Sequence, residues 1–205
     1  MLKVSIAVLV SGSGTNLQAL IDACGSGIIK SGQIKTVISS KKGVYALERA
    51  RQNGIDSFCV PKKECFGQED FEKKILDILK RQGTELIVLA GFLSILSPEF
   101  VNEYKDRIIN VHPSLIPAFC GDGFYGLAVH KAALDYGVKV SGATVHYVNQ
   151  ICDGGKIIMQ KAVSVKNGDT PESLQKRVME KAEWIILPKA CEQVCKVIQK
   201  EQNNG

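Results

Sequence analysis

The stretch Val4-Ser5-Ile6-Ala7-Val8-Leu9-Val10, followed by Ser11-Gly12-Ser13-Gly14-Thr15-Asn16, decides the fold class of this 205-residue chain. The first seven residues are almost all apolar, which is typical of a strand buried on both faces of a parallel sheet. Apolar residues then recur at helical spacing at Leu17, Leu20 and Ile21, so the glycine-containing segment joins a strand to the start of a helix. This strand–loop–helix unit predicts an α/β fold.

The alternation of strand and helix patterns continues through the first half of the chain and changes in the second. Further strands and helices are predicted in turn at residues 34–38, 44–52, 57–60, 71–79, 86–90, 98–104 and 107–111. Residues 127–136 then predict a helix, and residues 138–148 and 156–165 predict strands that can pair with each other. A last helix is predicted from Pro171, with an interruption at Pro188. We therefore expect one α/β domain, with a mostly parallel sheet in the N-terminal half and antiparallel strands in the C-terminal half.

Composition is that of an ordinary globular protein. A net charge of +5 with scattered lysines gives no indication of nucleic-acid binding. The N-terminal apolar run is too short to cross a membrane and lacks a signal-peptide pattern. Seven cysteines without a CxxC pair favour reduced thiols in a cytoplasmic protein. Three histidines without HExxH or HxH spacing give no case for a metal site.

The glycine-containing segment is the first candidate for binding chemistry. Gly12 and Gly14 let the backbone approach a ligand, and free N–H groups at a helix start can hold a phosphate. Side-chain donors come from the other members of the segment, Ser13, Thr15 and Asn16. The motif is neither GxGxxG nor a Walker loop, so a glycine-rich turn with a Ser or Thr cap stays the alternative.

The segment Asn110-Val111-His112, at the end of the predicted strand 107–111, is the second candidate. Residues i and i+2 of a strand share a face, so the amide and the imidazole can address one small volume. A donor beside a group that titrates near neutrality suits a reaction in which negative charge develops on oxygen. Asp153 would add a carboxylate at the sheet edge where ligands of open α/β sheets gather. A buried strand-end histidine and a simple turn aspartate are the alternatives.

Structural interpretations are favoured at three further positions. His146 ends a predicted strand, where a histidine usually has a satisfied structural role. His130 lies in the predicted helix 127–136 and is expected to be solvated or to pack. Gly91 follows the strand 86–90 and is expected to be core, although a glycine there could let a flat ligand lie against the backbone.

Taken together, these segments resemble the phosphoribosylglycinamide formyltransferases of purine biosynthesis. The resemblance covers the chain to about residue 190, and its motifs are Val8-Leu9-Val10-Ser11-Gly12-Ser13-Gly14-Thr15-Asn16-Leu17, Glu48-Arg49-Ala50, Leu89-Ala90-Gly91-Phe92, Asn110-Val111-His112-Pro113-Ser114-Leu115-Ile116-Pro117, Thr144-Val145-His146-Tyr147-Val148 and Asp153-Gly154-Gly155. The Asn-x-His-Pro-Ser segment is shared with other folate-dependent formyltransferases, whereas the N-terminal glycine loop points to enzymes of glycinamide ribonucleotide. The resemblance implies a single-domain, Rossmann-like formyltransferase fold over residues 1–205, with a phosphate-binding half (1–109) and a catalytic and folate-binding half (110–205).

The resemblance also implies roles for individual residues. Asn110, His112 and Asp153 match the catalytic trio of the family. The loop for the ribotide phosphate is matched by Gly12, Ser13, Gly14, Thr15 and Asn16, and an acidic contact to the glycinamide part by Glu183. The expected folate contacts are Leu93, Ser94, Ile95, Leu96, Asn110, Val148, Asn149 and Gln150. The expected supporting residues are Ser114, Thr144 and His146.

Four features depart from the pattern of the family. Ser94 and Gln68 stand where relatives often have arginine, near the folate and the ribotide respectively. Met179 replaces a polar residue. The segment 119–126, with the sequence Phe-Cys-Gly-Asp-Gly-Phe-Tyr-Gly, is unlike the better-known bacterial and animal members and is expected to reshape the site.

By this resemblance, the reaction moves a formyl group from N10 of 10-formyltetrahydrofolate, a co-substrate, to the primary amine of glycinamide ribonucleotide, without a metal. Asn110 and a protonated His112 would donate to the developing oxyanion, while Asp153 would raise the pKa of His112 and relay protons. Both partners are small molecules, neither nucleic acid nor a membrane is involved, and a monomer or homodimer is expected.

Two other functions compete with this one. Another folate formyltransferase could act on methionyl-tRNA or hydrolyse formyl-folate. Those enzymes usually carry an additional tRNA-binding or regulatory domain, and we expect neither in this chain. A non-catalytic nucleotide-binding module would explain the glycine loop but would leave Asn110, His112 and Asp153 without a purpose.

Overall fold

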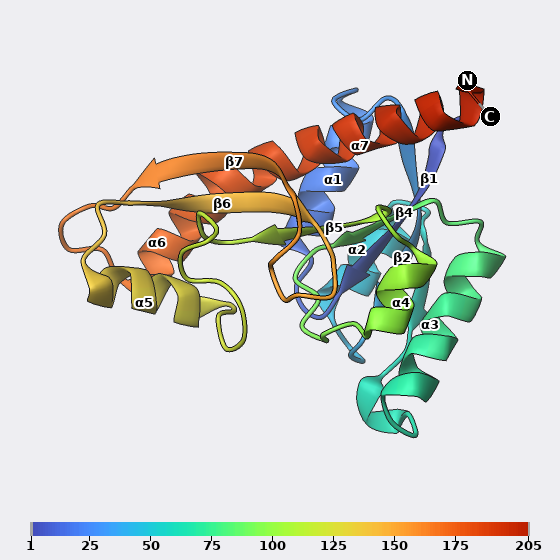
Figure 1. Cartoon of the computed structure of the whole chain (residues 1–205), viewed down its shortest axis with the longest axis horizontal. Coiled ribbons are helices and arrows are strands. Elements are labelled where there is room, and N and C mark those ends of the chain that lie inside the picture. The colour runs from blue at the N-terminus through green and yellow to red at the C-terminus, as the bar shows by residue number, and fades with distance from the viewer. Residues whose placement is uncertain (1, 205) are drawn as a thin grey trace.

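Strand β1 (Val4–Val10) lies inside a seven-stranded sheet in the computed structural model, which describes residues 2–204 (Figure 1). It pairs in parallel with β2 (Gly32–Ser39) on one side and with β4 (Leu86–Leu89) on the other. All seven residues of β1 are buried, as its continuous apolar sequence predicts.

The outer strands complete a mixed sheet of order β3-β2-β1-β4-β5-β6-β7. β3 (Asp56–Cys59) and β5 (Ile108–His112) pair in parallel with β2 and β4. β6 (Val140–Tyr147) and β7 (Ile157–Ser164) are antiparallel. The predicted change from a parallel to an antiparallel arrangement is therefore confirmed.

Helices cover both faces of the sheet. In chain order they are α1 (Thr15–Gly25), α2 (Tyr45–Gln52), the 3-10 turn η1 (Lys62–Glu64), α3 (Gln68–Arg81), α4 (Pro98–Glu103), α5 (Leu127–Tyr136), α6 (Pro171–Val178), the π-helical turn η2 (Met179–Glu183) and α7 (Trp184–Asn204). Ile6 and Val8 pack in one apolar layer with α1 and α7, while Ala7 and Leu9 pack in the other layer with α3 and α4. Because side chains of a strand alternate between faces, β1 supplies both cores. None of the helices that the structure describes is long and apolar enough to span a membrane.

Two helix starts follow the expected capping chemistry. The Ser97 hydroxyl accepts a hydrogen bond from the Phe100 N–H at 3.1 Å, and Pro98 follows it at the first position of α4. Thr170 and Ser173 form a reciprocal capping box at α6, where Pro171 is the first helical residue. These local signals set the helix boundaries in the structure.

The C-terminal helix does not break at Pro188, contrary to the sequence prediction. The irregularity lies earlier, at η2, and α7 runs through Pro188. The N–H that Pro188 lacks would have paired with the carbonyl of Trp184, the first residue of α7. The helical ladder is already rearranged just before that point, so the missing bond is accommodated at the junction.

The strand order of the sheet reverses at β1, which is the topological switch point of the fold. The connection from β1 leads to β2 on one side, whereas β4 lies on the opposite side, so a crevice opens at the carboxyl ends of β1 and β4. The segments that leave these two strands are joined, because the Ser11 N–H donates to the Gly91 carbonyl and the Ser11 hydroxyl accepts from the Leu93 N–H. The fold thereby places the glycine loop next to the segment expected to hold a folate.

Candidate active site

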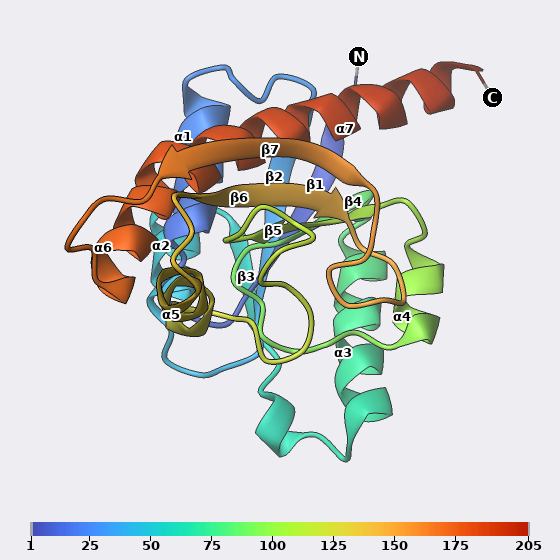
Figure 2. The same cartoon turned by 60° about the vertical axis from the view of Figure 1, so that its left-hand side comes forward.

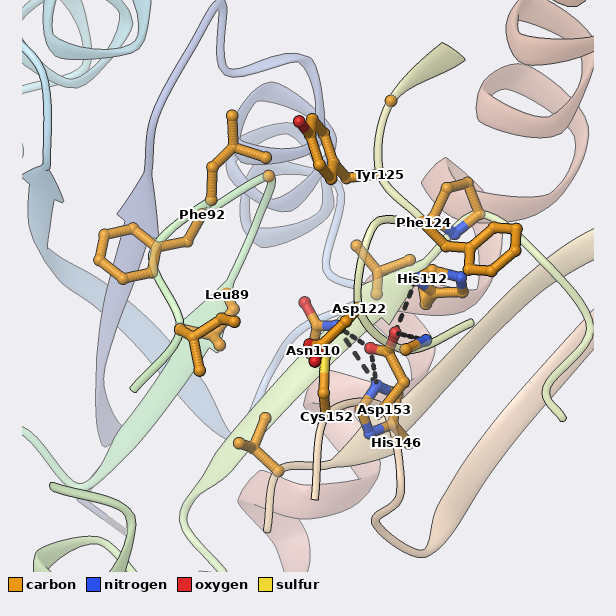
Figure 3. Close-up of a pocket in the computed structure, with 18 of the residues that line it drawn as sticks. Leu89, Phe92, Asn110, His112, Asp122, Phe124, Tyr125, His146, Cys152 and Asp153 are labelled. Carbon is orange, nitrogen blue, oxygen red and sulfur yellow. Dashed lines mark hydrogen bonds and ion pairs between the residues drawn. The ribbon is translucent and has the colours of Figure 1, made fainter. Parts of the chain in front are cut away.

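A cavity of about 580 Å³ lies at the carboxyl ends of β4 and β5 (Figure 3). Every residue expected to contact folate lines it, namely Leu93, Ser94, Ile95, Leu96, Asn110, Val148, Asn149 and Gln150. Leu89 and Phe92 form an apolar wall across the cavity from His146 and Asp153. The cavity thus combines an apolar side with a polar cluster, which is the usual composition of a site for an organic ligand.

The polar cluster contains the expected trio. Asn110 and His112 project from β5, and Asp153 reaches them from the loop between β6 and β7. Asp153 Oδ2 lies 3.4 Å from His112 Nδ1, and Asp153 Oδ1 lies 3.5 Å from Asn110 Nδ2. Figure 3 shows the three side chains converging. The structure therefore brings Asp153 to the Asn110–His112 pair, although Asp153 and Asn110 are 43 positions apart in the sequence.

His146 joins this cluster, although the sequence favoured a structural role for it. Asn110 and His146 are direct partners in the β5–β6 ladder, so their side chains are neighbours on one face. His146 Nδ1 donates to the Tyr147 carbonyl at 2.8 Å, and its Nε2 lies 3.3 Å from Asn110 Nδ2 and 3.5 Å from Asp153 Oδ1. The neutral ring accepts from Asn110 through Nε2, while a protonated ring would donate to Asp153.

The two central groups differ in charge, because burial dominates at His112 whereas hydrogen bonds and neighbouring charges dominate at Asp153. Burial lowers the pKa of His112, and the hydrogen bond to the Phe119 carbonyl and the charge of Asp153 offset that effect only partly. Asp153 does raise the pKa of His112, as expected, but desolvation is the larger effect, so the net pKa lies below its ordinary value. Burial raises the pKa of Asp153, but His146, the Gly121 N–H and His112 together hold it below its ordinary value. At neutral pH the cluster holds a carboxylate beside an uncharged His112.

The segment 119–126 closes over the trio. The His112 Nε2–H donates to the Phe119 carbonyl at 2.8 Å, and the Gly121 N–H donates to Asp153 Oδ2 at 2.9 Å. Phe119 and Asp153 both have positive φ angles, of 51° and 53°, which side-chain-bearing residues adopt only when surrounding contacts compensate the strain. The unusual segment is thus bonded directly to the catalytic candidates.

The glycine loop lies beside the cavity. Gly14 has a φ of 75° and begins α1 without any side-chain cap, so the alternative of a Ser or Thr cap is wrong. The Ser13 carbonyl accepts from the Arg49 Nε–H at 3.0 Å, which fixes a cation next to the loop. Uncapped N–H groups at a helix start and a nearby guanidinium suit an anion.

The members of the loop differ in position. Asn16 lines the main cavity, and its Nδ2 donates to Glu183 Oε2 at 2.7 Å. Thr15 lines a separate hollow of about 340 Å³ together with Arg49 and Trp184, and Gly12 and Ser13 are exposed. Burial raises the pKa of Glu183, which also lines the main cavity. The structure places Asn16 and Glu183 in the cavity wall and Gly12–Thr15 just outside it.

Thr144, an expected supporting residue, and Gln68, which departs from the family pattern, hold parts of the cavity wall in place. Thr144 Oγ1 donates to the Ser114 carbonyl and accepts from the Ile116 N–H, so it fixes the proline-rich exit from β5. Gln68 Nε2 donates to the Ile95 carbonyl at 2.9 Å and so steadies the segment expected to bind folate. Ser94 and Met179 line the cavity themselves.

His130 is a cavity residue that the sequence interpretation missed. It is fully buried, it forms part of the cavity wall, and neither ring nitrogen has a hydrogen-bond partner among the described residues. Burial, with a smaller effect of the neighbouring His112, lowers the pKa of His130 to about 4. The helical spacing from Val129 and His130 to Ala133 was the signal that could have placed this imidazole on the buried face of α5.

Within residues 2–204, no group of three or more His, Cys, Asp and Glu side chains is arranged to hold a metal ion. The polar cluster is therefore described by its hydrogen bonds and charges. Its donors and its carboxylate are suited to stabilise an oxyanion and to move a proton.

Comparison with known proteins places these observations in one family. The formyl transferase family model matches residues 4–191. The phosphoribosylglycinamide formyltransferase of Escherichia coli (strain K12) is 39% identical, over 90% of this chain and 84% of its own length. A glycinamide ribonucleotide transformylase from Symbiobacterium toebii has a TM-score of 0.88 at 39% identity, covering 95% of this chain and 88% of that one.

Larger relatives contain a similar region. The trifunctional purine biosynthetic protein adenosine-3 of Gallus gallus is 42% identical over 94% of this chain, which spans only 18% of that protein. The similarity is therefore confined to one region of that larger protein. Over most of its length, and at well above 30% identity, this chain belongs to the phosphoribosylglycinamide formyltransferase family.

Proposed function

We propose that this chain transfers the formyl group of 10-formyltetrahydrofolate to the primary amine of glycinamide ribonucleotide, in the de novo synthesis of purines. The observation that carries the proposal is the meeting of Asn110, His112 and Asp153 in one cavity. Its apolar side, at Leu89 and Phe92, suits the flat ring system of a folate. The uncapped start of α1, with Arg49 beside it, suits the ribotide phosphate.

The reaction begins when the ribotide amine attacks the formyl carbon. A C–N bond forms, and the formyl oxygen becomes an oxyanion. Asn110 stabilises that charge through its amide. The contacts of this amide with His146 and Asp153 are long, at 3.3 and 3.5 Å, so Asn110 exchanges them for a shorter one to the oxyanion. Negative charge beside His112 offsets the burial that lowers its pKa, so protonation of His112 becomes favourable as the oxyanion develops.

The reaction ends when the bond from carbon to N10 of the folate breaks. The attacking nitrogen must lose a proton, and N10 must gain one. Asp153 is ionised and lies within 3.5 Å of both His112 and His146, so it can accept the first proton and pass it on, directly or through water. The nucleophile is the substrate amine, and no cysteine takes part.

The direct test incubates the protein with both substrates and follows the absorbance of the folate. Loss of formyl-folate only in the presence of glycinamide ribonucleotide supports the proposal. Loss without the ribotide would identify a hydrolase, and absence of any loss would identify a binding module; either result contradicts the proposal.

Replacement of one oxyanion donor tests the role of Asn110. For Asn110→Ala we expect kcat to fall by about 100- to 1000-fold, which is typical when a preorganised donor is removed. Ribotide affinity, measured by calorimetry, should be largely kept, because the phosphate is held elsewhere. Near-normal turnover would remove Asn110 from the mechanism.

A further inference from the structure

His130 is the one imidazole of the three in this chain with no hydrogen-bond partner in the described structure. Its side chain is fully buried, and both Nδ1 and Nε2 are unpartnered. A buried polar group without a partner is destabilising, and native proteins rarely keep one without a purpose. Because His130 also forms part of the wall of the catalytic cavity, a bound molecule is able to supply the missing partner.

The chemistry of the ring limits what that partner can be. Burial lowers the pKa of His130 to about 4, so at neutral pH the ring carries one N–H donor and one lone pair. A phosphate or carboxylate would accept from the N–H but could not donate to the lone pair, so one ring nitrogen would stay unpaired. A hydroxyl or an amide can both donate and accept, so a neutral polar group matches this imidazole.

The position of His130 favours one of the two substrates. It lies on α5, which packs against α6. Figures 1 and 2 show the two helices together on the side of the sheet away from α3 and α4. Gln175 of α6, with Met179 and Glu183 of η2, lines the same cavity, and Glu183 is bonded to Asn16 of the glycine-loop helix. The folate wall is built from other segments, at residues 89–96 and 148–153.

From this arrangement we propose that His130 is a binding and positioning residue for the acceptor substrate, hydrogen-bonding a neutral ribose hydroxyl or the amide of the glycinamide part. This assignment rests on the proposed function, because the ribotide is the substrate it names. His130 and His112 line the same cavity, so a bond from His130 to the ribotide also helps to orient its amine.

Nuclear magnetic resonance of the ¹⁵N-labelled imidazoles tests the contact directly. With only three histidines, the His130 signals are identified from a His130→Leu sample. Glycinamide ribonucleotide alone should shift the His130 ring nitrogens, whereas 10-formyltetrahydrofolate alone should leave them nearly unchanged. A response to the folate only, or to neither ligand, overturns the assignment; the latter is the result expected if a buried water is the partner.

Kinetics and stability separate a binding role from a structural one. For His130→Leu, we expect KM for the ribotide to rise about fivefold, the typical effect of one neutral hydrogen bond, with KM for the folate unchanged. The melting temperature without ligand should stay the same or rise, since an orphaned polar group is replaced by an apolar one. His130→Gln keeps a donor and an acceptor and should restore part of the affinity.

Lys131→Ala is the matched control, because Lys131 is the next residue on the same helix and is exposed. It should change neither KM. If the wild type is active and His130→Leu leaves the ribotide KM unchanged, the His130 assignment fails while the proposed function stands. If the wild type transfers no formyl group, the proposed function fails. Should His130→Leu not fold, His130→Gln serves both to identify the His130 signals and to measure the change in ribotide KM.

Discussion

The Asp153 carboxylate is shared by two imidazoles and one backbone N–H, and this sharing determines what its replacement will do. Asp153→Asn keeps the shape but cannot carry a proton between nitrogens. We expect kcat to fall by at least about 100-fold, the usual contribution of a positioned acid–base group. The pH profile of kcat should also lose its acid limb, since the ionisation of Asp153 produces it.

Asp122→Asn is the charge control for that measurement. Asp122 belongs to the same cavity, and the close-up shows no bond from it to either imidazole, so the same loss of charge should lower kcat far less (Figure 3). Equal losses in the two variants would mean that the overall charge of the cavity matters and that the relay through Asp153 does not.

Gly14 and Gly12 offer a matched pair in the glycine loop. A Cβ on Gly14 would lie 2.7 Å from Ala46 Cβ, and its φ of 75° disfavours any side chain. Gly14→Ala should therefore displace the loop and raise the ribotide Kd by at least about tenfold, with folate binding spared. Gly12→Ala meets no atom within 4 Å and should change the ribotide Kd much less. Calorimetry with each ligand separately gives the Kd for the ribotide and for the folate. Equal increases of the ribotide Kd in the two variants would show that the positive φ of Gly14 and its contact with Ala46 are not needed for ribotide binding.

At the scale of elements, the two capped helices can be compared. Ser97 caps α4 and also donates to Glu72 Oε2 at 2.5 Å, so it anchors the end of segment 91–96, where we propose that the folate binds. Ser97→Ala should lower the free energy of unfolding by about 1 kcal/mol and raise KM for the folate. Thr170→Ala should cost a similar free energy at α6 without changing KM for the folate. Denaturant titration measures the free energy of unfolding, and steady-state kinetics measures KM for the folate. A raised KM for the folate in Thr170→Ala would mean that the loss of stability, and not the loss of the Ser97 anchor, is responsible.

Elements with local signals were predictable from the sequence, and elements fixed by packing were not. Each cap, at Ser97 and at Thr170, is formed by residues within a four-residue segment, so the local sequence predicts it. The continuous apolar run of β1 likewise predicts that this strand is buried. The π turn at Met179–Glu183 depends on how α6 and α7 pack together, and no local pattern marks it. The sequence therefore suggested Pro188 as the break, because proline is the visible local signal.

Only part of the candidate site was predictable from the sequence. Asn110 and His112 share a strand face, so their proximity follows from spacing alone. Its place near the sheet edge made Asp153 only a candidate, with a turn aspartate as the alternative, and the resemblance supplied its role. A contact from a loop more than forty residues away in sequence has no periodicity to reveal it. The bonds from Phe119 and Gly121 to the trio, and the burial of His130, arise only when the segment 119–126 and α5 fold against the sheet.

At the scale of the whole molecule, buried imidazoles should make the protein sensitive to acid. The folded-state pKa of His130 is about 4, below the ordinary value of 6.5, so between these pH values the unfolded chain binds a proton that the folded chain does not. Stability should therefore fall as pH drops through this window, by up to about 3 kcal/mol from His130, and should stop falling on its account below about pH 4.

The lowered pKa of His112 acts in the same direction. Denaturant titrations at neutral pH and at about pH 4.5 measure the loss, and His130→Leu should show a smaller one. An identical pH dependence in wild type and variant would mean that His130 is protonated in the folded state with little penalty.

The hydroxyl of Ser11 has a consequence for how the two substrates bind. It is buried, it lies 2.7 Å from the Ser40 hydroxyl, and it accepts from the Leu93 N–H at 3.0 Å. One side chain thus connects the glycine loop, the proposed phosphate site, with segment 91–96, the proposed folate site, so ordering either one restrains the other. Thermodynamic linkage then requires that each substrate change the affinity of the protein for the other substrate by the same factor. The order of binding would therefore affect the rate at which the ternary complex forms but not its amount at equilibrium.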